Sequence, residues 1–455
     1  MPAMKVQPAA ELNRMEWMLP VSKSHAIRWV ALAAQAEGDM VLHGMSTAGE
    51  DVLAMRRCLM QCGIQFTDLD AEGRALPSAE NADFIPDQRT VSWKIQGRKP
   101  NEWRPPGTVL HAGNSGTTLR ILMGLASRWD VPVMVDGDAN LRRRSFKVML
   151  DALEQAGVTV SHGIGPEHLP VLIQGPFEAK SIAVDATASS QPITSLLIAS
   201  AGRSAPFSIQ LEGEAVSTRH AALTADLCGW FGAEVERDDR SYTIHPWTLE
   251  PRALEVDVVS DASMMAFPLL AAAATGAAVH LVNPPSRDES LGHELLLDLA
   301  PSLGLSVSEG SWRWSAEHVK PCDVDLKDGN DLITPLCALL ALSGGGIVRG
   351  AAHAAHKESN RLNRTVDLLA QFGLGSEVTP DGLRIQGGQT LLQPTGPVQT
   401  WGDHRMHMTA LVLSMGLREE VLILGDRLHA VADPKAAERW QQVGAHVETV
   451  LHQPW

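Results

Sequence analysis

Basic residues are scarce in this sequence. Its 455 residues include 38 Lys and Arg against 53 Asp and Glu, which gives a formal net charge of −15 at pH 7. A chain this acidic is repelled by nucleic-acid phosphates and by anionic membrane surfaces, so we expect neither a nucleic-acid partner nor membrane binding. Any anionic ligand must therefore be held by a local cluster of cations rather than by the field of the whole protein.

Cysteines are also few, and no export signal is recognisable. The cysteines are odd in number, lack the spacing of a zinc site and lie in apolar segments, at positions 58, 62, 228, 322 and 337. They predict reduced, buried thiols. The N-terminal segment MPAMKVQPAAELNRMEW has no apolar core of the kind that a signal peptide needs. We therefore expect a cytoplasmic protein.

Long hydrophobic runs are limited to one, at residues 264–282. It contains Pro268, Thr275, Gly276 and His280 among weakly hydrophobic alanines. This composition favours a buried helix, a turn and a strand over a membrane span. The overall content of 44% hydrophobic and 20% charged residues is that of a globular protein. Because 455 residues exceed a single hydrophobic core, we expect two domains.

An amphipathic segment that ends at a glycine and continues into a short strand-like run recurs six times. These glycines are spaced roughly 70 to 90 residues apart, at Gly63, Gly157, Gly232, Gly304, Gly373 and Gly444. Each position is typical of a helix C-terminus closed by a residue with φ above zero.

A second segment, rich in Ala and Leu, also occurs six times. Its copies are residues 25–44, 117–137, 191–213, 263–283, 331–351 and 405–426. Each reads as a helix followed by a strand, and the helix is apolar around most of its circumference, which indicates burial in the middle of a domain. Six βα-type units, divided three and three, predict an α/β protein of two similar domains.

The residues that begin these apolar helices are polar. They are SKSH (22–25), NSGTT (114–118), SSQ (189–191), SDAS (260–263), GND (329–331) and GDHR (402–405). Helix capping accounts for Ser189 or Ser263. It does not account for Lys23 in a first turn, where the helix dipole disfavours cations, or for His404 beside Arg405. Helix N-termini combined with cations indicate sites for anions.

Two further basic clusters follow predicted strands, RRR (142–144) and HKESNR (356–361), although both could be solvated surface charges. With them, the candidate cations number seven: Lys23, Arg28, Arg120, Arg144, Lys357, Arg361 and Arg405. Such a set suits two phosphates and a carboxylate. Asp331, Glu358 and His404 are available for proton transfer.

These motifs together resemble the enolpyruvyl transferase family, and within it the EPSP synthases. SKSxxxR, GNSGTTLR, LRRR, SSQ, SDAS, NDL, KESxR and DHRM occur in the family's order from residue 19 to about residue 408. The resemblance implies two similar domains, each of three βαβαββ units with buried parallel helices, an inside-out α/β barrel. It places residues 1–20 and 258–455 in the first domain and residues 21–257 in the second, with the active site in the cleft between them.

The resemblance also implies a reaction, in which the 5-hydroxyl of shikimate 3-phosphate receives the enolpyruvyl group of phosphoenolpyruvate and phosphate is released. No metal or organic cofactor is implied, and we expect a monomer. The implied catalytic residues are Lys23, Asp331, Glu358 and His404. The implied substrate-binding residues are Ser24, Arg28, Asn114, Gly116, Arg120, Arg144, Ser189, Ser190, Gln191, Ser217, Lys357, Arg361 and Arg405.

Departures from the family pattern leave alternatives open. Val21 and Ile27 are unusual at their positions, and the family's late Lys-Ser-(Phe/Tyr)-Pro segment is absent. Lys435 follows about three residues late, after Asp433 and Pro434, and we expect it on the surface because Pro favours the start of an outer helix. An enolpyruvyl transferase with a different acceptor alcohol, or a non-catalytic anion-binding paralogue, would also fit. Sister enzymes that act on a UDP-linked amino sugar are disfavoured, because they carry a loop cysteine that this sequence lacks.

Overall fold

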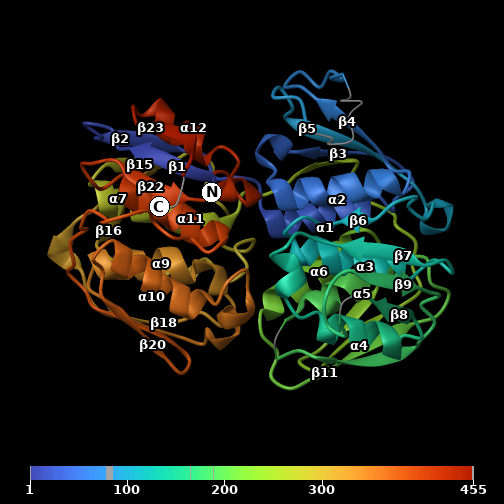
Figure 1. The fold of residues 1–455 in the computed structure, drawn as a ribbon. Coiled ribbons are helices and arrows are strands. Elements are labelled where there is room, and N and C mark those ends of the chain that lie inside the picture. The colour runs from blue at the N-terminus through green and yellow to red at the C-terminus, as the bar shows by residue number, and fades with distance from the viewer. Residues whose placement is uncertain (1, 78–85, 164, 188, 453–455) are drawn as a thin grey trace. The chain divides into compact units, whose positions relative to one another are not determined.

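The computed structural model describes residues 2–77, 86–163, 165–187 and 189–452. The chain forms two compact units. Unit 1 consists of Met1–Pro20 and Ser260–Trp455, and unit 2 consists of Val21–Val259. Unit 1 therefore contains both ends of the chain, and unit 2 is inserted between them, as the colours of Figure 1 show.

Unit 2 contains three four-stranded sheets, with the strand orders β14-β3-β5-β4, β6-β7-β9-β8 and β10-β11-β13-β12. In each sheet the first two strands are parallel and the other pairs are antiparallel. The strands are β3 (Gly38–His43), β4 (Gln65–Leu69), β5 (Ser92–Gly97), β6 (Leu110–His111), β7 (Val133–Asp136), β8 (Thr159–His162), β9 (Val171–Gln174), β10 (Ser181–Asp185), β11 (Phe207–Glu212), β12 (Val235–Arg237), β13 (Ser241–Ile244) and β14 (Glu255–Asp257).

Unit 1 repeats this arrangement with the strand orders β16-β17-β15-β2, β18-β19-β21-β20 and β22-β1-β23. The last sheet gains a parallel fourth partner through a bridge between Val398 and Ile423. The strands are β1 (Pro2–Gln7), β2 (Arg14–Trp17), β15 (Ala278–Leu281), β16 (Leu305–Ser308), β17 (Ser311–Trp314), β18 (Cys322–Asp325), β19 (Gly346–Arg349), β20 (Ser376–Thr379), β21 (Gly382–Ile385), β22 (Val421–Leu424) and β23 (His446–Leu451).

Six helices are buried along most of their length, and they coincide with the six apolar segments. They are α1 (Lys23–Ala33), α3 (Gly116–Ala126) and α5 (Gln191–Ala199) in unit 2, and α7 (Ala266–Thr275), α9 (Ile333–Leu342) and α11 (His404–Ser414) in unit 1. In unit 2, α3 packs against both α1 and α5, and in unit 1 the three buried helices contact one another pairwise. The core of each unit is therefore helical, with sheets outside it.

The other helix set closes at the recurring glycines. It consists of α2 (Glu50–Gln61), α4 (Lys147–Gln155), α6 (Thr218–Trp230), α8 (Leu295–Leu299), α10 (Arg361–Gln371) and α12 (Ala436–Gln442). The glycine that follows each helix has a φ between 74° and 97°, as its position predicted. The six repeats and the fold class, two sets of three βαβαββ units, are confirmed.

Three of the six repeats take a strand from a distant part of the chain. β14 pairs with β3, β2 pairs with β15, and β1 lies between β22 and β23. The N-terminal strands thereby belong to the same unit as the C-terminal half of the chain. The apolar run 264–282 forms α7, a turn at Gly276 with φ 74° and β15, as predicted. Among the described residues, no helix combines the length and apolarity needed to cross a membrane.

Candidate active site

Lys23 is the first residue of α1, which is capped by the side chain of Ser22. The Lys23 ammonium lies 3.0 Å from Oδ2 of Asp51, in the first turn of α2, and the two side chains are 18% and 8% exposed. Asp51 thereby offsets a cation that the dipole of α1 disfavours. The sequence prediction missed Asp51, because an acidic residue in a first helical turn is also an ordinary partner of the helix dipole.

Arg28 lies inside unit 2 with 1% of its surface exposed. Its Nε donates to Thr224 Oγ1 at 2.8 Å, its Nη1 to the Ser24 carbonyl oxygen at 2.7 Å, and its Nη2 to Thr194 Oγ1 at 3.0 Å. All three acceptors are neutral, and burial lowers the pKa of Arg28 to about 10. The Nη2 of Arg28 also donates to the His220 carbonyl oxygen at 3.2 Å, so the five N–H groups of this guanidinium make four hydrogen bonds within unit 2.

Gly116 is the first residue of α3 and lies among three polar side chains. A Cβ at this position would meet Arg120 Nη1 at 3.0 Å, Arg144 Nη1 at 3.5 Å and Gln191 Oε1 at 3.7 Å. Arg120 Nη1 donates to Gln191 Oε1 at 2.6 Å, and Arg144 Nη2 donates to Asn114 Oδ1. The structure therefore brings five predicted binding residues together, and we call this set the Gly116 group.

The two arginines of the Gly116 group provide a positive charge that suits an anion. Burial first, and then the neighbouring charge of Arg144, lower the pKa of Arg120 to about 9. Arg120 forms no ion pair with any carboxylate in the described part of the chain, and its guanidinium lies over the Phe146 ring at 4.6 Å. Two adjacent arginines that repel each other are stabilised when an anion binds between or beside them.

The remaining predicted residues of unit 2 begin helices α5 and α6. Ser189 Oγ accepts from the backbone N–H of Gln191 at 3.2 Å, and Ser190 is the buried N-cap of α5. The side chain of Gln191 donates to Thr117 Oγ1 at 2.9 Å, which connects α5 to the start of α3. Ser217 is the N-cap of α6 and has a left-handed φ of 52°.

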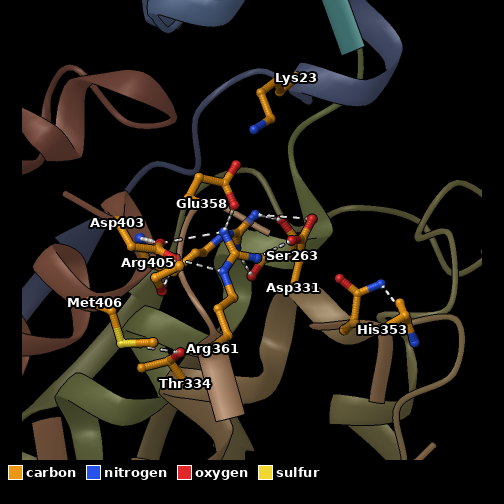
Figure 2. Close-up of polar contacts among 12 residues, drawn as sticks. Lys23, Ser263, Asp331, Thr334, His353, Glu358, Arg361, Asp403, Arg405 and Met406 are labelled. Atoms are coloured by element: carbon orange, nitrogen blue, oxygen red, sulfur yellow. Dashed lines mark hydrogen bonds and ion pairs between the residues drawn. The ribbon is translucent and has the colours of Figure 1, made fainter. Parts of the chain in front are cut away.

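In unit 1, Arg361 binds three carboxylates at once (Figure 2). Its Nε lies 2.9 Å from Asp403 Oδ2, its Nη1 2.8 Å from Asp331 Oδ1, and its Nη2 2.5 Å from Glu358 Oε2. Burial alone would lower the pKa of Arg361, but the three carboxylates outweigh burial and raise it. Ser359 Oγ also donates to Asp403, at 3.0 Å, so Asp403 receives bonds from two residues of the KESxR motif.

Arg405 lies next to this network in the first turn of α11 (Figure 2). Asp403 caps α11 by accepting from the backbone N–H of Arg405 at 2.9 Å. The Arg405 Nη2 donates to Ser263 Oγ at 2.8 Å and lies 3.5 Å from Asp331 Oδ2. His404, the first residue of α11, is 3% exposed. Four predicted residues thus belong to one contact network: Asp331, Glu358, Arg361 and Arg405. The same network contains Asp403 and Ser263, which were not predicted as site residues.

Lys357 immediately follows the short helix η7 (Ala352–His356). Burial first, and then the charge of Lys357, lower the pKa of His353 to about 4. The imidazole of His353 is therefore neutral at physiological pH, and its Nε2 accepts from the side-chain amide of Asn330 at 2.7 Å. Asn330 immediately precedes Asp331 in the short helix η6 (Asn330–Leu332), so this hydrogen bond helps to fix the helix that presents the carboxylate.

Lys435 lies just before α12, with its Nζ 3.1 Å from Glu438 Oε2 and its side chain 42% exposed. Its expected surface position is confirmed. Within the described ranges, the one close trio of metal-capable side chains is Glu234, Glu236 and His245, none of which is a predicted site residue.

Comparison with protein families gives one match over most of the chain. The family model described as EPSP synthase (3-phosphoshikimate 1-carboxyvinyltransferase) matches residues 6–433. A relative from Aeropyrum pernix, named 3-phosphoshikimate 1-carboxyvinyltransferase, is 30% identical over 454 residues, covering 98% of this chain and 96% of the relative. A relative of the same name from Methanothermobacter thermautotrophicus is 29% identical over 432 residues, covering 94% of this chain and 95% of the relative.

Solved structures share the fold. EPSP synthase from Acinetobacter baumannii superposes with a TM-score of 0.75 at 22% identity, covering 99% of this chain and all of that one. The enolpyruvyl transferase NikO from Streptomyces tendae superposes with a TM-score of 0.72 at 14% identity, covering 98% of each chain. At these identities the likeness establishes the architecture alone, so the acceptor substrate must be argued from the sequence relatives and from the site residues.

Proposed function

The chain belongs to the EPSP synthase family, and we propose that it transfers the enolpyruvyl group of phosphoenolpyruvate to the 5-hydroxyl of shikimate 3-phosphate. The products are the enolpyruvyl ether and inorganic phosphate, in a step of the shikimate pathway that leads to aromatic amino acids. We propose that the predicted residues of both units act on these two substrates.

The observation that most directly supports this reaction is the contrast between two residue groups. The Gly116 group contains two arginines beside a glycine at a helix start, an arrangement that suits a phosphate or carboxylate close to the backbone. The network around Arg361 contains three carboxylates, which suit proton transfer and orientation of a hydroxyl. An addition of an alcohol to a phosphorylated enol needs both kinds of group.

In the addition step, the 5-hydroxyl oxygen forms a bond to C2 of phosphoenolpyruvate while C3 gains a proton. We assign Asp331 as the acceptor of the hydroxyl proton, with Lys357 assisting, and Glu358 as the donor to C3, with His404 nearby. In the elimination step, C3 returns a proton and the C2–O bond to phosphate breaks. Lys23 contacts phosphoenolpyruvate and shares in proton transfer. The hydroxyl proton taken up by Asp331 leaves with the phosphate, so the protein ends in its starting protonation state.

The other predicted residues are assigned to binding. Ser24, Arg28 and Ser217, with the SSQ motif, hold shikimate 3-phosphate. The other four members of the Gly116 group, joined by Arg361 and Arg405, hold phosphoenolpyruvate; they are Asn114, Gly116, Arg120 and Arg144. No metal or organic cofactor enters these steps, since proton transfer and charge stabilisation suffice for them.

Phosphate release by the purified protein tests this function. Release that requires both phosphoenolpyruvate and shikimate 3-phosphate is expected. Release only when another phosphorylated or cyclic alcohol replaces shikimate 3-phosphate would favour an enolpyruvyl transferase with a different acceptor. Binding of both compounds without any release would favour the non-catalytic paralogue.

Two further expectations belong with this proposal. We propose a cytoplasmic location, which is supported by five cysteines that are all buried and unpaired in disulfides. We also propose that the protein acts as a monomer, which size-exclusion chromatography with light scattering would test. A dimer mass at the concentration of the assay would contradict it.

A further inference from the structure

In unit 1, Asp261, Ser263 and Arg405 are joined by consecutive hydrogen bonds. The Ser263 hydroxyl lies 2.6 Å from Asp261 Oδ1, and Arg405 Nη2 lies 2.8 Å from Ser263 Oγ. A carboxylate only accepts hydrogen bonds and a guanidinium only donates them. The single proton of the Ser263 hydroxyl therefore points to Asp261, and the oxygen lone pair accepts from Arg405.

Capping does not require this hydroxyl. Asp261 caps the short helix η4 (Ala262–Met265) by accepting from the backbone N–H of Ser263 at 2.9 Å. An alanine at position 263 would donate the same backbone bond. The side chain of Ser263 thus has a separate role, and its partner is Arg405.

Arg405 depends strongly on Ser263 for its orientation. The guanidinium is buried, with 1% of the residue exposed. The Ser263 carbonyl oxygen accepts from Nη1 at 3.3 Å, in addition to the bond from Nη2 to the hydroxyl, and Nε has no acceptor among the described residues. One residue therefore accepts from both terminal nitrogens of the arginine.

The same nitrogen of Arg405 also faces Asp331. The distance from Arg405 Nη2 to Asp331 Oδ2 is 3.5 Å, whereas Arg361 Nη1 approaches Asp331 Oδ1 to 2.8 Å (Figure 2). Charge-assisted bonds between guanidinium and carboxylate normally measure about 2.7–2.9 Å. Arg405 thus forms a long ion pair with Asp331, whereas its short hydrogen bond goes to the Ser263 hydroxyl.

We infer that Ser263, oriented by Asp261, is a positioning residue that keeps the Arg405 guanidinium from closing onto Asp331. This inference rests on the proposed function, in which Arg405 holds phosphoenolpyruvate and Asp331 accepts the proton of the attacking hydroxyl. A shorter contact would strengthen the compensation between the two charges, each of which is needed for the substrates. The hydroxyl holds Nη2 at the longer distance by accepting one of its two hydrogens at 2.8 Å.

The first test is Ser263→Ala with Ser260→Ala as the matched control. Ser260 lies three positions earlier in the same motif, and its hydroxyl donates to the Asn283 carbonyl oxygen at 2.9 Å, outside this chain of bonds. Ser263→Ala is expected to raise KM for phosphoenolpyruvate at least tenfold and to lower kcat, with KM for shikimate 3-phosphate within twofold. Ser260→Ala is expected to change all three constants less than twofold. Equal kinetic effects of the two variants would overturn the inference.

A double-mutant cycle tests whether Ser263 acts through Arg405. Arg405→Lys removes the fork that the hydroxyl orients, so adding Ser263→Ala to that variant is expected to cost less than threefold in kcat/KM for phosphoenolpyruvate. The same loss in both backgrounds would show that Ser263 acts elsewhere. General destabilisation would also lower activity in both backgrounds and would be detected as an additive effect.

A crystal structure of Ser263→Ala decides the point without any activity measurement. Arg405 Nη2 is expected within about 3.2 Å of an Asp331 oxygen, the ordinary range of a hydrogen bond. An unmoved guanidinium would overturn the inference even if the kinetics change. If the wild-type protein releases no phosphate from the two substrates, the proposed function fails, and this structure still shows whether Ser263 controls the position of Arg405.

Discussion

Replacing Gly116 by alanine separates substrate binding from packing. The added methyl group would lie 3.0 Å from Arg120 Nη1 and 3.5 Å from Arg144 Nη1. The first distance is too short for a comfortable contact, so the Arg120 guanidinium must move by a few tenths of an ångström. That movement strains its 2.6 Å bond to Gln191 Oε1 and places a methyl group where the backbone would otherwise approach an anion.

The expected effect is a KM for phosphoenolpyruvate raised about tenfold, equivalent to about 1.4 kcal/mol. A charge-assisted hydrogen bond contributes about 1.5–3 kcal/mol, so this magnitude corresponds to weakening one such bond rather than abolishing it. Stability should not fall, because Gly116 has no left-handed φ and alanine is preferred over glycine in helices by up to about 1 kcal/mol. KM for shikimate 3-phosphate should change less than twofold.

Gly124, two turns along the same helix, supplies the control. A Cβ at Gly124 would overlap Ser195 Oγ and lie 2.9 Å from the Ser195 carbonyl oxygen on α5. Gly124→Ala should therefore destabilise the packing of α3 on α5 by about 1–3 kcal/mol. A domain of this size loses about 2–4 °C in Tm per kcal/mol.

Steady-state kinetics with each substrate varied, together with thermal unfolding, measure both variants. Gly116→Ala should change KM for phosphoenolpyruvate without lowering Tm, and Gly124→Ala should lower Tm without changing that KM. If Gly116→Ala affected both substrates equally, or lowered Tm as Gly124→Ala does, Gly116 would be a packing glycine and the assignment of the Gly116 group would be wrong.

Three other predictions concern lysines and histidines. Lys435→Ala should change kcat/KM for phosphoenolpyruvate less than threefold, since exposed ion pairs contribute about 0–1 kcal/mol, and a hundredfold loss would show that this lysine reaches the substrate. Lys23→Met should abolish phosphate release and also lower Tm, because buried Asp51 loses its ion pair at 3.0 Å; wild-type turnover in this variant would remove Lys23 from the mechanism. Burial lowers the pKa of His407 to about 3 and of His429 to about 4. As the pH falls, both histidines therefore bind protons in the unfolded chain while they are still neutral in the folded chain. The free energy of unfolding should fall between about pH 6.5 and pH 4, and an equally steep fall in His429→Asn would contradict this origin.

Much of the fold could be predicted because its signals are local and repeated. The six glycines have positive φ and the six apolar segments form the buried helices, since helix ends and helix faces depend on residues within a few positions. The strands that three of the repeats take from distant parts of the chain could not be predicted in this way. β14, β2 and β1 pair with partners far away in the sequence, and their short segments have no pattern that selects those partners.

Site residues could be predicted where a residue type is unfavourable at its position in a helix start. Lys23 is the example, because the helix dipole disfavours a cation in the first turn. Asp51, Asp403 and Ser263 were missed because each also satisfies an ordinary rule for helix starts, so their contacts with Lys23, Arg361 and Arg405 are visible only in the folded chain. Residues that cap one helix and orient a neighbouring side chain cannot be told from simple caps by sequence alone.

The count of seven cations in the sequence also overstates the charge available to substrates. Arg28 is enclosed among neutral acceptors, and Arg361 is shared by three carboxylates. Arg361 and Arg405 together face three carboxylates, which offset part of the positive charge that these two arginines could offer to an anionic substrate. In the Gly116 group, by contrast, the pKa of Arg120 is lowered by burial and by Arg144, and a phosphate or carboxylate there would relieve both effects. The attraction for an anionic substrate therefore depends on how each arginine is paired after folding rather than on the number of arginines.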